Sequence, residues 1–89
     1  MIKDIVAKTR KEQGLTLRAF GEIAGMTGAA IQQFEDGSAK PGTHTLEDWF
    51  VSPHEWLSDI AIEIYAERYR AKMRRARGRL MRMVARARS

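Results

Sequence analysis

The chain has 89 residues, of which 44% are hydrophobic and 30% charged, a composition typical of one small soluble domain. A chain this short buries only about 60 to 65% of the surface that its unfolded state exposes, and it has no cysteine for a disulfide or a thiolate metal site. An elaborate enzyme cleft is therefore not expected. The two histidines, His44 and His54, stand ten residues apart without further ligands. The sequence predicts a protein that is not an enzyme and uses no cofactor or metal.

The sequence also shows no sign of membrane insertion or export. Its longest charge-free stretches fall far below the roughly 18 residues that a membrane span needs, and residues 1–11 carry five charged side chains, unlike a signal peptide. We expect a cytoplasmic protein without a membrane partner.

Charge is divided unevenly along the chain. Residues 1–43 carry six Lys or Arg against five Asp or Glu, and residues 44–67 carry six acids and no Lys or Arg. Residues 68–89 carry ten Lys or Arg and no acid. Because neutralising phosphates releases counterions and strengthens binding, this basic block favours a polyanion as partner. The alternative is a solvated, frayed tail.

Helical periodicity runs through the whole chain, and no segment alternates as a strand pair would. The sequence therefore predicts an all-α fold. A first helix is expected to end near Gly14, where a glycine can adopt the left-handed conformation. Thr16 is expected to cap a second helix that buries Phe20 and ends at Gly25.

Three further helices follow. Thr27 is expected to cap a third helix that buries Ile31 and Phe34 and ends at Asp36 and Gly37. After a loop over residues 38–42, Thr43 or Thr45 opens a fourth helix. Ser52, Pro53 and Glu55 form a second start signal, with a cap serine and a proline at the first helical position. From Pro53 a last helix is expected to run to about Arg77 or Arg86, interrupted by nothing stronger than Gly78.

Two short helices joined by a glycine turn, each capped by threonine, form the skeleton of a helix-turn-helix. Gly21 offers the small surface on which the third helix could cross closely. The run Leu15–Thr27 (LTLRAFGEIAGMT), followed by Ile31, Phe34–Gly37 (FEDG) and Pro41, resembles the lambda-repressor-like (Cro-type, XRE-type) helix-turn-helix family. Residues 51–57 also resemble the point where that family enters its fifth helix. The resemblance covers roughly residues 2–57.

The resemblance implies a five-helix DNA-binding domain over residues 1–57, with the third helix in the major groove and the second crossing the backbone. Residues 58–89 are then an extended basic C-terminal helix. The positions that the resemblance places toward the bases are Thr27, Gly28, Ala29, Gln32 and Gln33. Those that it places toward phosphates are Thr16, Leu17 and Arg18 at the start of the second helix, and Ser38, Lys40 and Thr43 around the loop. It also implies that Arg10 pairs with Glu35, which we expect to support folding.

The chain departs from the family in two places. Leu17 stands where the family commonly has a glutamine that anchors the second helix to a phosphate, and leucine cannot do this. Gly28, Ala29 and Ala30 carry no hydrogen-bonding side chain, so direct readout falls to Gln32 and Gln33. We therefore expect modest specificity for each half-site, with a dimer or the basic tail supplying the rest. The alternative is that both glutamines are only a solvated helix face.

The last helix has a regularity that the resemblance does not cover. Apolar residues recur at alternating spacings of four and three, as in a coiled-coil seam: Ile62, Ala66, Tyr69, Met73, Ala76, Leu80, Met83 and Ala87. In a symmetric parallel pair the basic residues beside this seam would face one another. Relief could come from DNA phosphates, from the acidic 44–67 block of a second subunit packed antiparallel, or from a separate acidic protein. The residues expected to contact phosphates or an acidic partner are Arg70, Lys72, Arg74, Arg75, Arg77 and Arg79. The alternative is an amphipathic helix that is partly frayed when alone.

Together these features predict a sequence-specific regulator of transcription that binds double-stranded DNA. We expect a small repressor of the phage or mobile-element kind, homodimeric through its C-terminal helix and associated with the nucleoid when bound to DNA. The alternative is an interaction module in which the helix-turn-helix fold is a scaffold. In that case the basic C-terminal helix docks onto a partner protein or a nucleoprotein complex.

Overall fold

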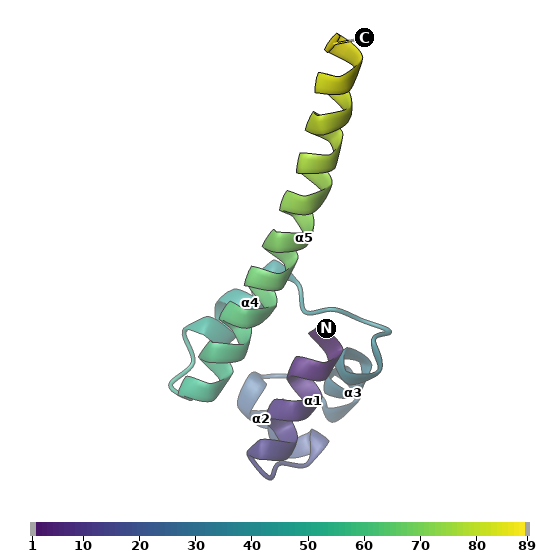
Figure 1. The fold of residues 1–89 in the computed structure, drawn as a ribbon. Helices are drawn as coiled ribbons and strands as arrows, with labels where there is room; N and C mark the ends of the chain where they lie inside the picture. Colours follow the sequence, from purple (N-terminus) through teal and green to yellow (C-terminus); the bar gives the residue numbers. More distant parts are fainter. Residues whose placement is uncertain (1, 89) are drawn as a thin grey trace.

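The computed structural model describes residues 2–88, so that Met1 and Ser89, the outer ends of the two expected segments, lie outside it. The described residues form five α-helices and no strand: α1 (Ile2–Glu12), α2 (Leu17–Ala24), α3 (Gly28–Asp36), α4 (Thr43–Phe50) and α5 (Glu55–Arg88). The first turns of α5 join α1–α4 in a bundle, and the rest projects from it (Figure 1). The expected all-α class with a long last helix is confirmed. None of these helices is both long enough and apolar enough to span a membrane.

The two short helices at the centre of the chain begin and end as their sequence predicts. The hydroxyl of Thr16 accepts a hydrogen bond from the amide of Ala19, and that of Thr27 accepts one from the amide of Ala30, each at 3.1 Å. Gly25 and Gly37 follow the helix ends with φ of 73° and 82°, in the left-handed region that favours glycine. Both helices are therefore delimited by local residues.

The start of α4 is one of the two that the sequence predicts, whereas the start of α5 differs. Thr43 is the first residue of α4, and Gly42 before it occupies the cap position without a side-chain hydrogen bond. The start of α5 predicted at Pro53 is wrong, because α5 begins at Glu55. The reason for this difference is a local hydrogen bond. The hydroxyl of Ser52 accepts a hydrogen bond of 3.1 Å from the amide of His54, two residues later, and therefore does not cap the helix. The carbonyl of His54 accepts the first helical amides instead.

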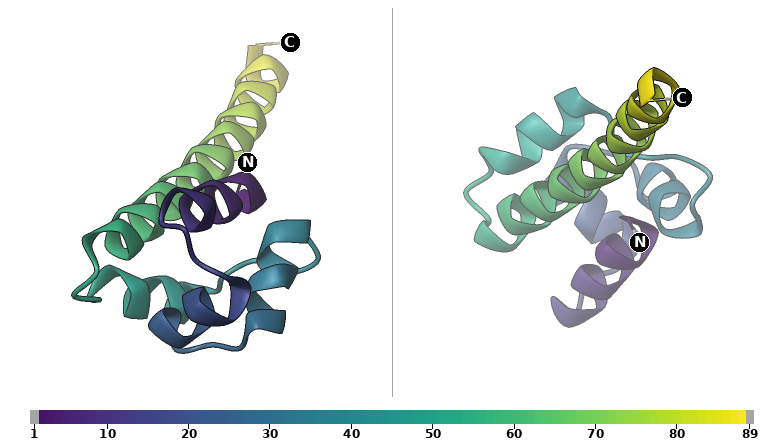
Figure 2. Two further views of the ribbon diagram at one scale, coloured as in Figure 1. Left: turned by 90° about the horizontal axis from the view of Figure 1, so that it is seen from below. Right: turned by 45° about the horizontal axis from the view of Figure 1, so that its top comes forward.

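One hydrophobic core holds the bundle together. Its buried side chains come from all five helices: Val6, Phe20, Ile31, Phe34, Leu46, Trp49, Leu57, Ile60, Ala61 and Ile64. Trp49 packs edge-on against Phe20 and Phe34, with ring centroids 6.1 and 5.9 Å apart. The predicted burial of Phe20, Ile31 and Phe34 is confirmed. In both views of Figure 2 the C-terminal turns of α5 extend beyond the other helices.

Helices α2 and α3 cross at glycines. A Cβ on Gly21 would lie 2.6 Å from the carbonyl oxygen of Met26 and 2.9 Å from the carbonyl carbon of Thr27. A Cβ on Gly28 would lie 3.2 Å from the backbone nitrogen of Arg18. Because these neighbours are backbone atoms, larger residues would force the helices apart. The expectation that Gly21 permits a close crossing is confirmed.

Candidate nucleic-acid interface

The outer face of α3 is open to solvent. Thr27 at its start and Ala29, Gln32 and Gln33 along it are exposed, and we call these four residues the α3 face. The two glutamines carry amides that both donate and accept hydrogen bonds, whereas Ala29 offers a methyl group. Gly28 is different, since its Cβ position points at the backbone of α2. It therefore serves the helix crossing and brings no side chain to the α3 face.

The start of α2 brings one cation next to this face. Arg18 is exposed and pairs with Glu22 one turn later at 3.4 Å, with 89% of its own side chain accessible. An ion pair this exposed contributes little, so the guanidinium can exchange Glu22 for a phosphate. Thr16 is also exposed, with its hydroxyl engaged as the helix cap. Leu17 is partly buried and packs against the core, so it anchors α2 from the inside.

A largely buried ion pair fixes the far end of α3. Arg10 donates two hydrogen bonds to the carboxylate of Glu35, at 2.7 and 3.0 Å, and a third to the carbonyl of Leu15 at 3.0 Å. The side chains of Arg10 and Glu35 are only 19% and 13% exposed. The hydrogen bonds to Glu35 raise the pKa of Arg10. The arrangement joins α1, α3 and the segment before α2, as expected of a pair that supports folding.

The loop between α3 and α4 also contacts α5. The amide of Ser38 donates to the carboxylate of Asp36 at 2.8 Å, and hydrogen bonds from Ser38 lower the pKa of that carboxyl. Ser38, Lys40 and Thr43 are exposed, as phosphate contacts must be. Pro41 is buried, and its carbonyl accepts a hydrogen bond from the guanidinium of Arg68 on α5. Hydrogen bonds therefore fix both ends of the loop, at Ser38 and at Pro41, while the Lys40 side chain between them remains accessible.

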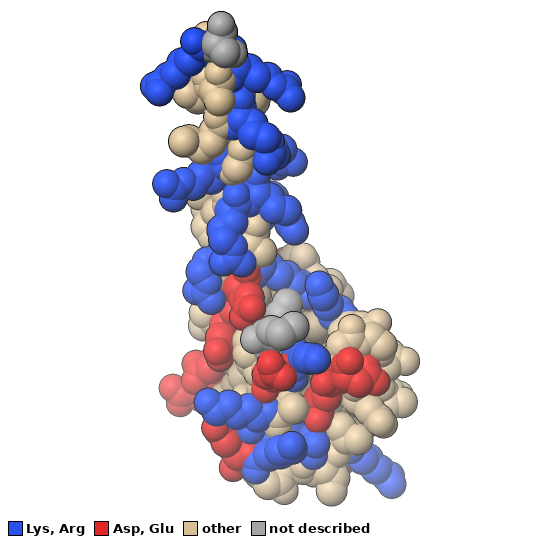
Figure 3. Space-filling view, turned by 45° about the vertical axis from the view of Figure 1, so that its right-hand side comes forward, with Lys and Arg blue, Asp and Glu red and all other residues tan. Residues whose placement is uncertain are grey.

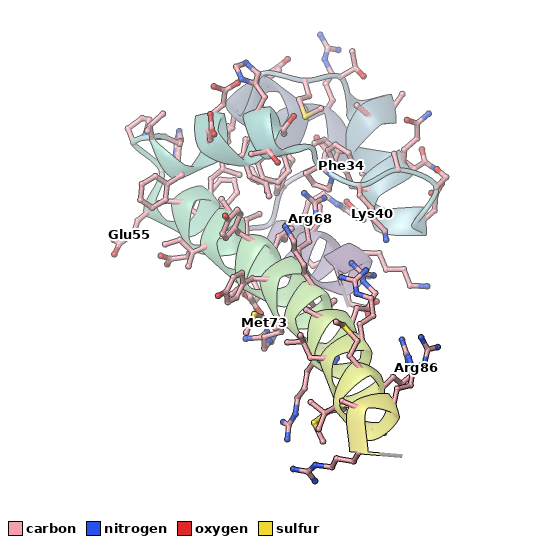
Figure 4. All side chains as sticks on the ribbon, turned by 90° about the horizontal axis from the view of Figure 1, so that it is seen from above. Phe34, Lys40, Glu55, Arg68, Met73 and Arg86 are labelled. Carbon is pink, nitrogen blue, oxygen red and sulfur yellow. The ribbon has the colours of Figure 1, made fainter. Side chains whose placement is uncertain are left out.

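A cleft of 690 Å³ opens between this loop, the start of α1 and the domain-facing side of α5. Phe34 and Gly37 lie at its α3 wall, and two acids, Asp36 and Glu67, also line it. Six cations gather around it: Lys3, Lys40, Arg68, Lys72, Arg74 and Arg75. We call this site the basic cleft. In Figure 4, Arg68 lies on the side of α5 that faces Lys40 and Phe34, whereas Met73 lies on the opposite side.

The basic cleft unites two sets of residues that the sequence analysis kept apart. It places Lys40, expected in the phosphate-binding loop, beside Lys72, Arg74 and Arg75 of the basic block. Lys3 and the loop-facing role of Arg68 were missed, because both depend on how α1 and the loop pack against α5. The sequence signal for Arg68 was only its membership of the basic block. The expected contacts Arg70, Arg77 and Arg79 are exposed but do not line the cleft.

The apolar residues of the predicted seam are uncovered in the single chain. Ile62, Tyr69, Met73, Leu80 and Met83 are 51 to 62% exposed. Ala66 and Ala76 between them are partly exposed, and Ala87 is exposed. We call this stripe the apolar face of α5. Basic side chains cover the projecting part of α5 around it, and acidic ones gather below, nearer the bundle (Figure 3).

The apolar face continues onto α4, which the sequence analysis did not predict. A groove of 540 Å³ lies between the two helices, lined by Ile62, Tyr65 and Ala66 from α5 and by Phe50 and Val51 from the end of α4. Phe50 and Val51 are 54% and 76% exposed. Exposed apolar surface of this extent marks an interaction site more often than a free surface.

The described residues hold no cluster of three or more His, Cys, Asp or Glu side chains that could bind a metal ion. Their distinctive surfaces are the α3 face, the basic cleft and the apolar face of α5. Comparison of the chain with protein-family models, with curated proteins and with solved structures found no match in any of the three.

Proposed function

We propose that the protein is a sequence-specific regulator of transcription that binds double-stranded DNA as a homodimer, through a helix-turn-helix of the lambda-repressor-like type. In this reading α3 lies in the major groove and α2 crosses the backbone. The supporting observation is that exposed cationic side chains lie near both ends of α3. Arg18 lies at the start of α2, and Lys40 leads from the loop into the basic cleft.

The chemistry divides between the two surfaces. Gln32 and Gln33 can hydrogen-bond the edges of bases, adenine above all, and Ala29 can contact a thymine methyl group. The basic cleft and Arg18 supply sequence-independent attraction to the phosphates. Because only two side chains on the α3 face form such hydrogen bonds, each half-site carries limited information. A dimer that reads two half-sites would compensate.

Substitution of the two glutamines tests the proposal. On the duplex that the protein binds most tightly, Gln32→Ala with Gln33→Ala should weaken binding by about 30-fold or more, since each of the two base contacts that are lost is worth about 1 to 3 kcal/mol. Binding to an unrelated duplex should change by less than about threefold, because phosphate contacts remain. Gln13→Ala, an exposed glutamine outside α3, is the matched control. Unchanged affinity of the double variant for its best duplex would overturn the proposal.

The second candidate is an interaction module whose basic helix docks onto an acidic protein or a nucleoprotein complex. The observation that favours it is the contrast between the sparse α3 face and the ten basic residues of the block over 68–89. This reading predicts that affinity for DNA is the same for every duplex and depends on α5 alone. The glutamine variants therefore separate the two functions.

A further inference from the structure

The apolar face of α5 points away from the molecule's own bundle. In a helix each residue turns the side-chain direction by about 100°. The residues that α5 presents to the core and the basic cleft, such as Ile64 and Ala71, therefore lie about half a turn from Ile62, Tyr69 and Met73. From Ile62 to Leu80 the apolar face extends about 27 Å at about 1.5 Å per residue. No other part of the described chain covers it, since its large side chains are more than half exposed.

Charges beside the apolar face decide which orientation of a second copy fits. On one flank Glu63 is followed by Arg70 and Arg77, and on the other Tyr65 is followed by Lys72 and Arg79. In a parallel pair opposite flanks meet, so Arg77 of each copy would face Lys72 of the other. In an antiparallel pair each flank meets the same flank of the other copy, and Arg77 then faces Glu63. Only the antiparallel orientation joins acid to base.

The α4 side of the groove reinforces this complementarity. Glu47 of α4 and Tyr65 of α5 both line the groove, so the flank that carries Lys72 and Arg79 in the outer half of α5 has an acid near the bundle. Both flanks are thus acidic near the bundle and basic toward the C-terminal end. A second copy running the opposite way brings its basic end to each acidic region.

We infer that the apolar face and the α4–α5 groove are covered by α5 of a second copy of this chain, packed antiparallel. This inference rests on the homodimer of the proposed function and specifies its geometry. Coiled-coil spacing gives the register: Ile62 of one copy packs on Leu80 of the other, Ala66 on Ala76, and Tyr69 on Met73, with Glu63 beside Arg77. The small Ala66 and Ala76 layers let the helices approach closely. Arg70 and Lys72 meet their own counterparts at the centre, where their long stems let the charged ends reach solvent.

Cysteine cross-linking tests the orientation, since the chain has no cysteine of its own. In an antiparallel pair, Ile62→Cys and Leu80→Cys variants mixed in a glutathione buffer should form a disulfide between the two different chains, and neither variant should cross-link efficiently to itself. Both residues are exposed in the single chain, so the core is left intact. Self-cross-linking of Leu80→Cys would show a parallel pair and overturn the inference. So would a protein without any cross-link that sediments as a monomer at high micromolar concentration.

Charge reversal provides an independent test. Arg77→Glu should weaken the antiparallel dimer by about tenfold, because two exposed ion pairs become repulsive, and adding Glu63→Arg in the same chain should restore the affinity. A parallel pair predicts the opposite, since Glu at position 77 would attract Lys72 of the other copy. Arg75→Glu, which makes the same charge change on the cleft side of α5, is the control and should leave dimerisation unchanged. These measurements contain no DNA, so their failure is distinct from a failure of the proposed DNA binding.

Discussion

Substitution of Gly21 by alanine has two opposing effects on the stability of the fold. Replacing a helical glycine gains about 1 kcal/mol in helix propensity, but the new methyl group would lie 2.6 Å from the carbonyl oxygen of Met26. Backbone atoms cannot rotate away, and overpacking of this kind costs about 1 to 3 kcal/mol or more. We therefore expect Gly21→Ala to lower the free energy of unfolding, measured by denaturant titration.

Gly78, a second glycine within a helix, provides the matched control for Gly21. A Cβ there would meet only the end of the Arg82 side chain at 3.8 Å, an ordinary contact. Gly78→Ala should therefore stabilise α5 locally and slow amide hydrogen exchange around residue 78. If Gly21→Ala were as stable as the original chain, the close crossing of α2 and α3 would be refuted.

Substitutions of Arg10 and Glu35 should change the free energy of unfolding non-additively, because the two side chains form an ion pair. Glu35→Met alone leaves a largely buried guanidinium with the carbonyl of Leu15 as its remaining described partner, which should cost about 2 to 4 kcal/mol. Replacing both residues by methionine removes the stranded charge, so the double variant should be more stable than Glu35→Met. Because the pKa of Arg10 is raised, the stabilisation is complete below the ordinary arginine value and is lost only as pH rises through the raised one. The loss of unfolding free energy caused by Glu35→Met should therefore be the same at about pH 6 and 9. Additive costs in chemical denaturation would contradict this account.

At the scale of the helix, α5 has two faces with separate tasks. Its first turns and the basic cleft lie on the side of the bundle, and its apolar face lies on the other. Association and phosphate binding, which the sequence alone does not assign to separate faces of the helix, are therefore compatible. Met73→Glu and Leu80→Glu should each weaken self-association in sedimentation, because a carboxylate would enter an apolar interface. Equal association of these variants and the original chain would place the interface elsewhere.

The basic cleft predicts a change in salt dependence. Arg74→Gln with Arg75→Gln should reduce the slope of log affinity against log salt by about 2, since about 0.9 counterion is released for each phosphate neutralised. The loss should be similar for all duplexes, because these contacts do not read sequence. The control, Arg82→Gln with Arg88→Gln, removes two exposed cations that do not line the cleft and should change the slope less. Equal effects of the two pairs would mean that the cleft has no special part in binding.

At the scale of the molecule, the features predicted correctly are those that short segments decide. Thr16, Thr27, Gly25 and Gly37 act within one turn of their own position, and helical spacing identifies Ile31 as buried. The start of α5 was predicted wrongly because the Ser52 hydroxyl can either cap a helix or accept a hydrogen bond from the amide of His54, and the sequence does not show which of the two is favoured.

The surface features that the sequence did not predict depend on contacts between segments that are distant in the chain. The basic cleft needs Lys3, Lys40 and Arg68 to be brought together by the packing of α1 and the loop on α5. The extension of the apolar face onto Phe50 and Val51 depends on how α4 lies beside α5. Spacing along one helix carries no information about either arrangement.

Selection of duplexes from a random pool tests most directly whether this small helical protein reads DNA sequence as a dimer. We expect a consensus of two short half-sites related by two-fold symmetry, as a symmetric dimer requires. The consensus should weaken when Gln32 and Gln33 are replaced by alanine. Recovery of duplexes without any shared sequence would contradict the proposed function.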